Sequence, residues 1–444
     1  MAHASNTYRS IWRISGPIII GLIAQNLMVV IDTAFLGRLG EVTLGAAAIG
    51  GIFYLCLVML GSGFSIGSQI IIGRRNGSQN LKQIGPVFDH TVYFMIGLAS
   101  FLFLVLTFAA PSFLEWFLKS DAVLEESLIF LKHRRFGFLF GFLVLAFNAF
   151  YIGTTRTNIL IASTVLMASL NIFLDYSLIF GNFGMPKMGI AGAAMATNIA
   201  EVITFLFLLG WAWKDKSVST YWLFRFPKPN WLQYRPLLKI AVPVMFQYFF
   251  SFSAWFVFFM VIEQIGETAL AASNITRSFY MLLMIPVWGL SSATNSLVSN
   301  LIGQGKSDEV IPLIRKVLLI GTGISLVVVQ VNIFLPEQIA GFFTEESHLI
   351  EATVPLLRVI SLALIAFSFG MIIFSGLSGT GKTFVALMIE IAAISFYLGT
   401  AFFMAIVLNA SAPVVWFVEV VYFSLLGLFS LLYLRTNKWK VMKV

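Results

Sequence analysis

The sequence predicts an all-α membrane protein in which twelve transmembrane helices form two six-helix, pseudo-symmetric lobes around a central cleft. Composition is the first observation that predicts it. The 444 residues are 59% hydrophobic and 11% charged, whereas soluble domains average about 25% charged residues. The second observation is the length of the apolar segments, because a helix needs about 20 residues to cross a bilayer. The third is an internal duplication of the chain.

Twelve apolar segments are long enough to span a membrane, and most of the connections between them are short. They lie at roughly 12–36, 45–72, 88–110, 128–152, 158–180, 189–213, 236–261, 275–302, 312–334, 353–377, 384–407 and 413–434. The longest connection, 214–235, is rich in Lys, Trp and Pro. We therefore predict an N-lobe over 1–213, a cytoplasmic linker over 214–235 and a C-lobe over 236–444.

The placement of charge predicts the orientation in the membrane. Most of the 28 Lys and Arg residues fall on the side of the two termini, and the acidic residues of the connections fall mainly on the other side. Cytoplasmic connections carry the excess of basic residues, so both termini are expected in the cytoplasm of a bacterial cell, with the protein in its inner membrane. The net charge of +8 follows this topology, and no nucleic-acid partner is expected.

The two halves are related by one constant shift. A shift of 226 (243 − 17) places Pro17 on Pro243, residues 39–44 on 265–270, and residues 153–157 on 379–383. Each half contains an even number of spans, so both copies run the same way through the membrane. Parallel repeats of this kind are one of the two common transporter layouts.

Asp32 lies inside the first apolar segment, where a carboxylate costs about 2.5–3.5 kcal/mol to insert. Such a residue is retained where it faces the bundle interior or a wet cavity, and it then marks an ion or substrate path. The same shift places Asp32 on Phe258, where the second half has no carboxylate. The architecture therefore does not require the charge, which favours a functional role for Asp32.

Two later spans carry matching polar pairs. Asn171 and Asp175 are four residues apart in span five, and Thr197 and Glu201 are four apart in span six, so each pair shares a helix face. Carboxylate, amide and hydroxyl oxygens suit a small hard cation, and the carboxylates could bind a proton instead. Interhelical hydrogen bonding without ion binding is the alternative.

The segment from Pro17 to Asp32, the Asn171–Asp175 pair, the run 192–197 and the duplicated halves resemble the multidrug and toxic compound extrusion (MATE) transporters of the MOP flippase superfamily. The resemblance covers the whole chain. It implies that Asp32, Asn171, Asp175 and Thr197 form an N-lobe cation site, where Na⁺ or H⁺ binds in exchange for substrate. No other cofactor is expected.

One position departs from the family pattern. Some members carry an acidic residue eight positions after the proline of span seven, where this chain has Ser251. A second ion site in the C-lobe is therefore left open, with Glu263 and Glu390 as its candidates.

Other polar residues of the spans are candidates for lining the cavity. They are Gln25, Asn26, Asn198, Glu201 and Arg277. Arg134 and Arg135 stand at the outer start of span four, and we expect them to snorkel towards the headgroups.

Several function classes are not expected. Residues 376–383 match the P-loop pattern, but that motif needs a preceding strand in an α/β unit, and here it joins two apolar spans. The single cysteine, Cys56, and four dispersed histidines offer no zinc-site spacing. No nucleophile–base set is visible in a loop, so neither ATP binding nor an enzyme is predicted.

The predicted function is secondary active antiport. Small organic compounds, cationic or amphipathic, would be exported in exchange for Na⁺ or H⁺ by alternating access, which amounts to multidrug efflux. The expected partners are the lipid bilayer and a small-molecule substrate, and the expected state is a monomer. The alternative is a flippase for a lipid-linked precursor on a related scaffold, which would need a cationic cleft.

Overall fold

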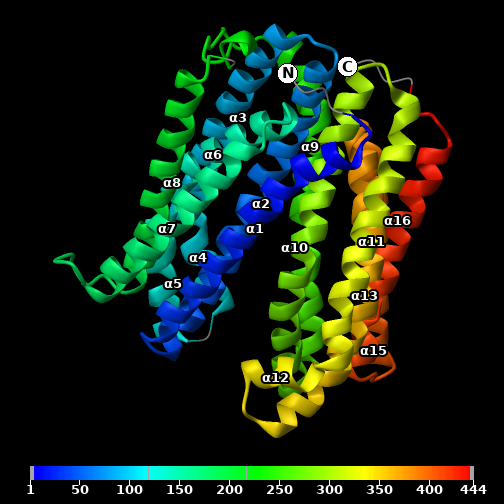
Figure 1. Cartoon of the computed structure of the whole chain (residues 1–444). Helices are drawn as coiled ribbons and strands as arrows, with labels where there is room; N and C mark the ends of the chain where they lie inside the picture. The colour runs from blue at the N-terminus through cyan, green and yellow to red at the C-terminus, as the bar shows by residue number, and fades with distance from the viewer. Residues whose placement is uncertain (1–4, 119, 217, 441–444) are drawn as a thin grey trace. The chain divides into compact units, whose positions relative to one another are not determined.

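The computed structural model describes residues 5–118, 120–216 and 218–440, and within these ranges the regular structure is entirely helical (Figure 1). The helices of the first half are α1 (Tyr8–Gly37), α2 (Glu41–Gly77), α3 (Ile84–Leu104), α4 (Ala110–Phe117), α5 (Asp121–Arg134), α6 (Gly137–Gly153), α7 (Asn158–Phe180) and α8 (Ile190–Lys214). Those that follow are α9 (Trp231–Glu263), α10 (Glu267–Gly303), α11 (Val310–Phe334), α12 (Pro336–Phe343), α13 (Ser347–Gly379), α14 (Thr383–Phe402), α15 (Ala412–Trp416) and α16 (Val418–Arg435). Short 3₁₀ or π-helical turns connect several of them.

The twelve predicted spans are confirmed in number when one bent pair is counted as a span. Among the described residues, eleven helices are long and apolar enough to cross a membrane. The twelfth span is the pair α5 and α6, whose axes meet at 53°. The chain is thus an all-α, multi-pass membrane protein.

The internal duplication extends to the bounds of the elements. α2 and α10 begin at residues 41 and 267 and end at 77 and 303, which is again a shift of 226 (267 − 41). α4 and α12, at 110–117 and 336–343, obey the same shift. The residues before α2 and α10 are Gly40 and Gly266, with φ of +117° and +139°, a conformation that side-chain-bearing residues rarely adopt. The two halves therefore use the same turn at the same place.

The helices pack into two compact units. The N unit comprises Ile20–Met245, and the C unit comprises Met1–Ile19 with Phe246–Val444. In the N unit α2 packs against α3, α5 and α6, while α7 packs against α8. In the C unit α13 packs against α10, α11 and α16, while α14 packs against α16. The lobe limits and the linker at 214–235 stay a prediction from sequence symmetry.

Glycines set one close helix crossing in the N unit. A Cβ on Gly67 would lie 2.2 Å from the Cα of Ala241, and a Cβ on Gly63 would lie 2.5 Å from the carbonyl oxygen of Val244. Small residues at four-residue spacing let helix backbones approach in a membrane. Gly63 and Gly67 therefore allow the first part of α9 to pack directly on α2.

Candidate cation-binding site

Four polar side chains meet in the N unit, from three helices. Asp32 comes from α1, Asn171 and Asp175 from α7, and Thr197 from α8. With its nitrogen facing the carboxyl groups, the Asn171 amide donates to Asp32 Oδ1 at 2.8 Å and to Asp175 Oδ2 at 3.1 Å. The Asn171 amide oxygen then accepts from the Thr197 hydroxyl at 3.0 Å. The structure thus brings together the four residues predicted for the site, with Asn171 at their centre.

Burial makes this cluster chemically unusual. Asn171 and Asp175 are fully buried, and Asp32 and Thr197 are partly buried. The Asp32 and Asp175 carboxyl groups share the Asn171 amide as a donor, so they would repel each other if both were ionised, and a proton or cation would relieve that repulsion. Asp175 Oδ1 is buried without a hydrogen-bond partner. A buried polar atom in that state is costly, and a proton or small cation beside it would satisfy it.

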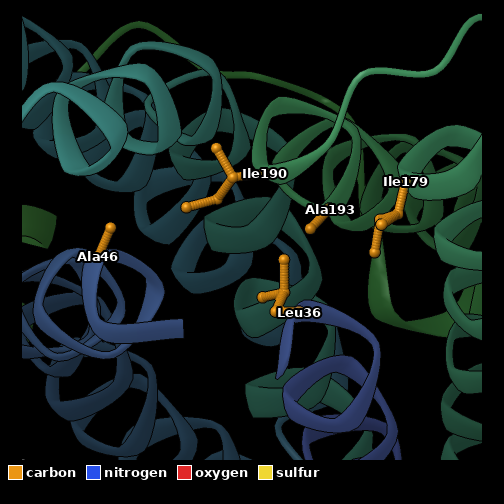
Figure 2. Close-up of a cluster of buried hydrophobic side chains, with 5 residues drawn as sticks. All are labelled: Leu36, Ala46, Ile179, Ile190 and Ala193. Atoms are coloured by element: carbon orange, nitrogen blue, oxygen red, sulfur yellow. The ribbon is translucent and has the colours of Figure 1, made fainter. Parts of the chain in front are cut away.

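An apolar cluster lies next to the site. Leu36, Ile179 and Ala193 each stand four residues from a site residue on the same helix, and all three are buried. Ala46 of α2 and Ile190 of α8 complete the cluster, and Figure 2 shows these five side chains. The cluster thus places buried apolar side chains one helical turn from Asp32, Asp175 and Thr197.

A buried ion pair accompanies the site. Arg134 Nη2 lies 2.5 Å from Glu201 Oε1, and Arg134 Nη1 donates to Glu201 Oε2 at 3.0 Å and to Asn198 Oδ1 at 2.6 Å. The guanidinium also lies 4.4 Å from the centre of the Tyr54 ring, within the range of a cation–π contact. Asn198 and Glu201, predicted to line the cavity, thus hold Arg134.

The prediction that Arg134 snorkels to the headgroups is wrong. Its side chain is 10% exposed, because Glu201 of α8 and Tyr54 of α2 surround it. Gly137 makes the space: a Cβ there would lie 1.7 Å from Arg134 Nη1. A glutamate inside an apolar span was the sequence signal for a buried basic partner.

The remaining candidates lie in varied surroundings. Gln25 and Glu263 are exposed, and Asn26 donates to the Leu22 carbonyl of its own helix at 2.9 Å. Arg277 lies over the Phe259 ring at 5.0 Å, and Glu390 is 2% exposed in the C unit. Their roles in a cavity or a second ion site stay predictions.

Two buried carboxylates were not predicted from the sequence. Asp89 of α3 accepts hydrogen bonds from the backbone N–H groups of Phe224, Arg225 and Phe226, and Glu419 of α16 is buried in the C unit. Asp89 is the second residue of the predicted span 88–110 and Glu419 the seventh of the predicted span 413–434, and neither was named as a candidate from the sequence. The P-loop match, 376–383, covers the turn between α13 and α14, so a helix precedes it where the motif requires a strand.

Donor chemistry limits what the site can bind. Two carboxyl groups, one amide and one hydroxyl are hard oxygen ligands, which suit Na⁺ or another small cation and disfavour soft metals. The same carboxyl pair can hold a single proton between its oxygens. Within the described residues no group of three or more His, Cys, Asp or Glu could form a metal centre.

Comparison with known families identifies the architecture. The MatE family model matches residues 17–177 and 243–419. The two matches begin at Pro17 and Pro243, the residues that the internal shift superimposes.

Curated relatives are similar over most of the chain. A "Probable multidrug resistance protein NorM" of Thermotoga maritima is 28% identical over 386 residues, which cover 83% of this chain and 79% of the relative. The "Multidrug resistance protein MdtK" of Yersinia enterocolitica is 25% identical, covering 68% of this chain and 66% of the relative.

Solved structures share the fold. A structure described as MATE in complex with MaL6 superimposes with a TM-score of 0.89 at 22% identity, covering 97% of each chain. The outward-facing conformation of a multidrug resistance MATE family transporter of the MOP superfamily also gives 0.89 at 22% identity, covering 98% of this chain and 96% of that one.

Proposed function

The chain belongs to the MATE family of membrane transporters, and we propose that it is a secondary active antiporter for small organic compounds. Cationic or amphipathic substrates leave the cell in exchange for Na⁺ or H⁺. The names of its relatives, which are multidrug resistance proteins, support a multidrug efflux role. The coupling ion is cargo, and no resident cofactor is proposed.

One observation carries the coupling proposal: a buried amide bridges two carboxyl groups from different helices. Asn171 donates to both Asp32 and Asp175. Two ionised carboxylates that share one amide donor repel each other strongly in a medium of low dielectric constant. A proton or cation removes that repulsion, so ion binding favours the arrangement in which α1 and α7 are held together.

Ion binding is therefore linked to the position of α1. Pro17 lies inside α1, where its ring removes one backbone hydrogen bond and weakens the helix locally. Loss of the ion leaves Asp32 repelled by Asp175, and α1 can then change its course. Such a change supplies the two states that alternating access requires.

The proposal also covers the location of the protein, its orientation in the membrane and its partners. Both termini lie in the cytoplasm and the protein lies in a bacterial inner membrane, as the Lys and Arg placement indicates. It acts as a monomer, with the lipid bilayer and the transported compound as its partners. ATP, nucleic acid and an enzymatic step have no part in it.

The test is ion-driven efflux of a fluorescent organic cation from proteoliposomes. Na⁺ and pH gradients are imposed separately, and wild type is compared with Asp32→Asn. Asp121→Asn is the matched control, because Asp121 is an exposed carboxylate in the first turn of α5. We expect one gradient to drive efflux in wild type and in the control, and neither to drive it in Asp32→Asn.

The outcome names the coupling ion and tests the alternative. Loss of coupling in Asp32→Asn alone supports the site, and the active gradient identifies Na⁺ or H⁺. Wild-type indifference to both gradients and to every cation tried overturns the antiport proposal. Movement of a lipid-linked precursor across the vesicle membrane would then support the flippase alternative.

A further inference from the structure

Two cations share one tryptophan ring at the end of the N unit where α8 is connected to α9. The Arg225 guanidinium lies 3.8 Å from the centre of the Trp222 ring, and Lys82 Nζ lies 4.8 Å from it. Both distances are within the range of a cation–π contact. Lys82 comes from the turn between α2 and α3, whereas Trp222 and Arg225 come from the connection between α8 and α9. Two segments that are far apart in the sequence thus bring their cations to one ring.

Neither cation has a carboxylate partner within the described part of the chain. The ion pairs found there do not include Lys82 or Arg225, and both residues are exposed. Trp222 is itself 37% exposed. We call these three side chains the basic surface of the N unit. An anion that reaches the exposed part of the Trp222 ring meets both positive charges.

The surrounding segments do not neutralise this charge. Residues 72–90 and 214–239 contain nine Lys or Arg residues, two Asp and no Glu. Both aspartates have other partners. Asp89 accepts three backbone N–H groups, and Asp215 Oδ2 lies 3.0 Å from Arg156 Nη2. The basic surface therefore attracts an anion from outside the chain.

The repeat shows that the fold does not require a cation at this turn. The shift of 226 (308 − 82) places Lys82 on Asp308. Asp308 Oδ1 lies 2.6 Å from Lys440 Nζ, so the equivalent turn of the C unit carries the opposite charge and is neutralised within the chain. The positive charge belongs to the surface of the N unit and not to the shared architecture.

The backbone of the connection is held in an uncommon conformation at the basic surface. Trp222, Phe224 and Phe226 have φ of +58°, +61° and +42°, which residues with a side chain adopt at a cost in free energy. The Asp89 carboxylate binds the N–H groups of this segment. Gly85 of α3 makes room for it, because a Cβ there would lie 2.1 Å from the Trp222 carbonyl oxygen. The connection is therefore fixed to α3, and its arginine is presented at a defined position.

Exposed tryptophans place the basic surface at the depth of the lipid headgroups. Trp213 is the last residue but one of α8 and Trp231 is the first residue of α9, and they are 70% and 68% exposed. Tryptophan is enriched at the membrane–water interface. Trp222 and Arg225 lie between these two residues in the chain, and Lys82 lies in the first turn of the span Leu81–Trp116. The two cations therefore lie at the level of the lipid phosphates.

We propose that Lys82, Trp222 and Arg225 bind the headgroup phosphate of an anionic phospholipid in the adjoining leaflet. The guanidinium donates parallel N–H groups to phosphate oxygens, the ammonium adds a second positive charge, and the indole ring keeps the two cations together. A zwitterionic headgroup fits poorly, because its ammonium would face two cations while both nearby aspartates have other partners. This binding goes beyond the proposed antiport function and does not rest on it.

Native mass spectrometry of the purified full-length protein in detergent tests the proposal. Phosphatidylglycerol is titrated, and the fraction of protein that retains it is measured. A basic residue near an anionic lipid surface raises affinity about fivefold. We therefore expect Lys82→Gln and Arg225→Gln each to weaken binding about fivefold and the double variant about twentyfold or more. Phosphatidylcholine should bind weakly and to the same extent in wild type and in these variants.

Two further variants separate this site from general positive charge. Trp222→Leu leaves the net charge unchanged, so the weaker phosphatidylglycerol binding that we expect identifies the ring as part of the site. Lys306→Gln is the matched control, because Lys306 is exposed at the equivalent turn of the C unit but has Glu309 Oε1 at 3.7 Å. It should bind phosphatidylglycerol as wild type does.

The affinities decide between this site, net charge and free phosphate. Equal affinity for phosphatidylglycerol in wild type and in the Lys82→Gln/Arg225→Gln variant overturns the proposal. An equal loss in Lys306→Gln also overturns it, because binding then follows net charge alone. Displacement of the lipid by an equal concentration of inorganic phosphate would assign the surface to free phosphate instead. Lys82 and Arg225 are exposed, so their variants should fold and test the proposal even if Trp222→Leu does not.

Discussion

Arg134 and Glu201 form an ion pair inside the apolar part of the N unit, with 2.5 Å between Nη2 and Oε1 and exposed fractions of 10% and 8%. The repeat shows that the fold does not need this pair. A shift of 226 (360 − 134) places Arg134 on Ile360 and Glu201 on Gly427. The C unit thus has uncharged residues where the N unit holds two opposite charges.

Removing one partner of this pair should strongly destabilise the protein. Arg134→Gln leaves the Glu201 carboxylate buried without its cation, at a cost of about 3–5 kcal/mol. The apolar double variant Arg134→Met/Glu201→Leu should lose less, because no charge is left unpaired. Thermal unfolding in detergent, followed by intrinsic fluorescence, measures both effects.

The exposed pair Lys306–Glu309 provides the control for this prediction. Its charged atoms are 3.7 Å apart and its side chains are 50% and 41% exposed, so Lys306→Gln should change stability by less than about 1 kcal/mol. Equal melting shifts for Arg134→Gln and Lys306→Gln would contradict the assignment of Arg134 as a buried ion-pair residue.

The close contact of α2 with α9 gives a second prediction. Gly67→Ala should lower the melting temperature, because its Cβ would lie 2.2 Å from the Ala241 Cα and overpacking costs about 1–3 kcal/mol. Gly51→Ala on the same helix is the control: nothing lies within 4 Å of its Cβ, so it should stabilise slightly. Similar effects of the two substitutions would show that the crossing does not depend on Gly67.

Periodicity and duplication predicted much of the molecule, for a physical reason. Bilayer thickness fixes the length of each span, and the four-residue spacing of Asn171 and Asp175 fixes their common face. Asp32, Asn171, Asp175 and Thr197 could therefore be grouped from their places in the spans and from the family resemblance. The bridging role of Asn171 could not be predicted, because it depends on the rotation of α1 and α8 about their axes.

The sequence does not predict which side chains of distant helices contact each other. Arg134 and Glu201 are 67 residues apart, and nothing in the apolar pattern states that α5 and α8 are neighbours. Glu419 is the second residue of α16 but the seventh of the predicted span 413–434, and the apolar pattern names no partner for it. Its burial arises from the tyrosine and tryptophan side chains packed over it, which only the fold brings together.

The Asn171 amide should set how readily the Asp32–Asp175 pair takes up a proton. Asn171→Leu keeps the side-chain size but removes the N–H donors that face Asp32 and Asp175. Those donors stabilise the ionised carboxylates by about 1.5–3 kcal/mol, so their loss favours the protonated pair, and under a pH gradient the proton concentration at half-maximal efflux should fall by about tenfold or more. The proteoliposome assay under a graded ion gradient measures this concentration.

Asn182→Ala is the matched control, because Asn182 follows the end of α7 and its side chain donates to the Tyr176 carbonyl, at 3.2 Å. It should leave the half-maximal ion concentration unchanged. Asn171→Ala checks that Leu does not act through its bulk. An unaltered ion dependence in both Asn171 variants would show that the bridge contributes nothing to ion binding.

Asp89 should hold the connection between α8 and α9 against α3. Its carboxylate accepts the N–H groups of Phe224, Arg225 and Phe226 at 3.0, 3.1 and 2.9 Å. Phe224 and Phe226 have φ of +61° and +42°, and successive N–H groups in alternating backbone conformations form an anion-binding nest. Without the anion, that strained backbone loses its main support.

Asp89→Ala should therefore open this connection locally while leaving the helices folded. Limited trypsin digestion measures the opening at Arg225, which is exposed and lies within the bonded segment. Loss of about 1.4 kcal/mol of local stability raises cleavage about tenfold when opening is fast. Asp215→Ala removes a carboxylate from the same connection but keeps the three N–H bonds, so its cleavage at Arg225 should match wild type. Equal protection of Arg225 in Asp89→Ala and wild type would mean that the packing of Phe224 and Tyr221, and not the carboxylate, retains the segment.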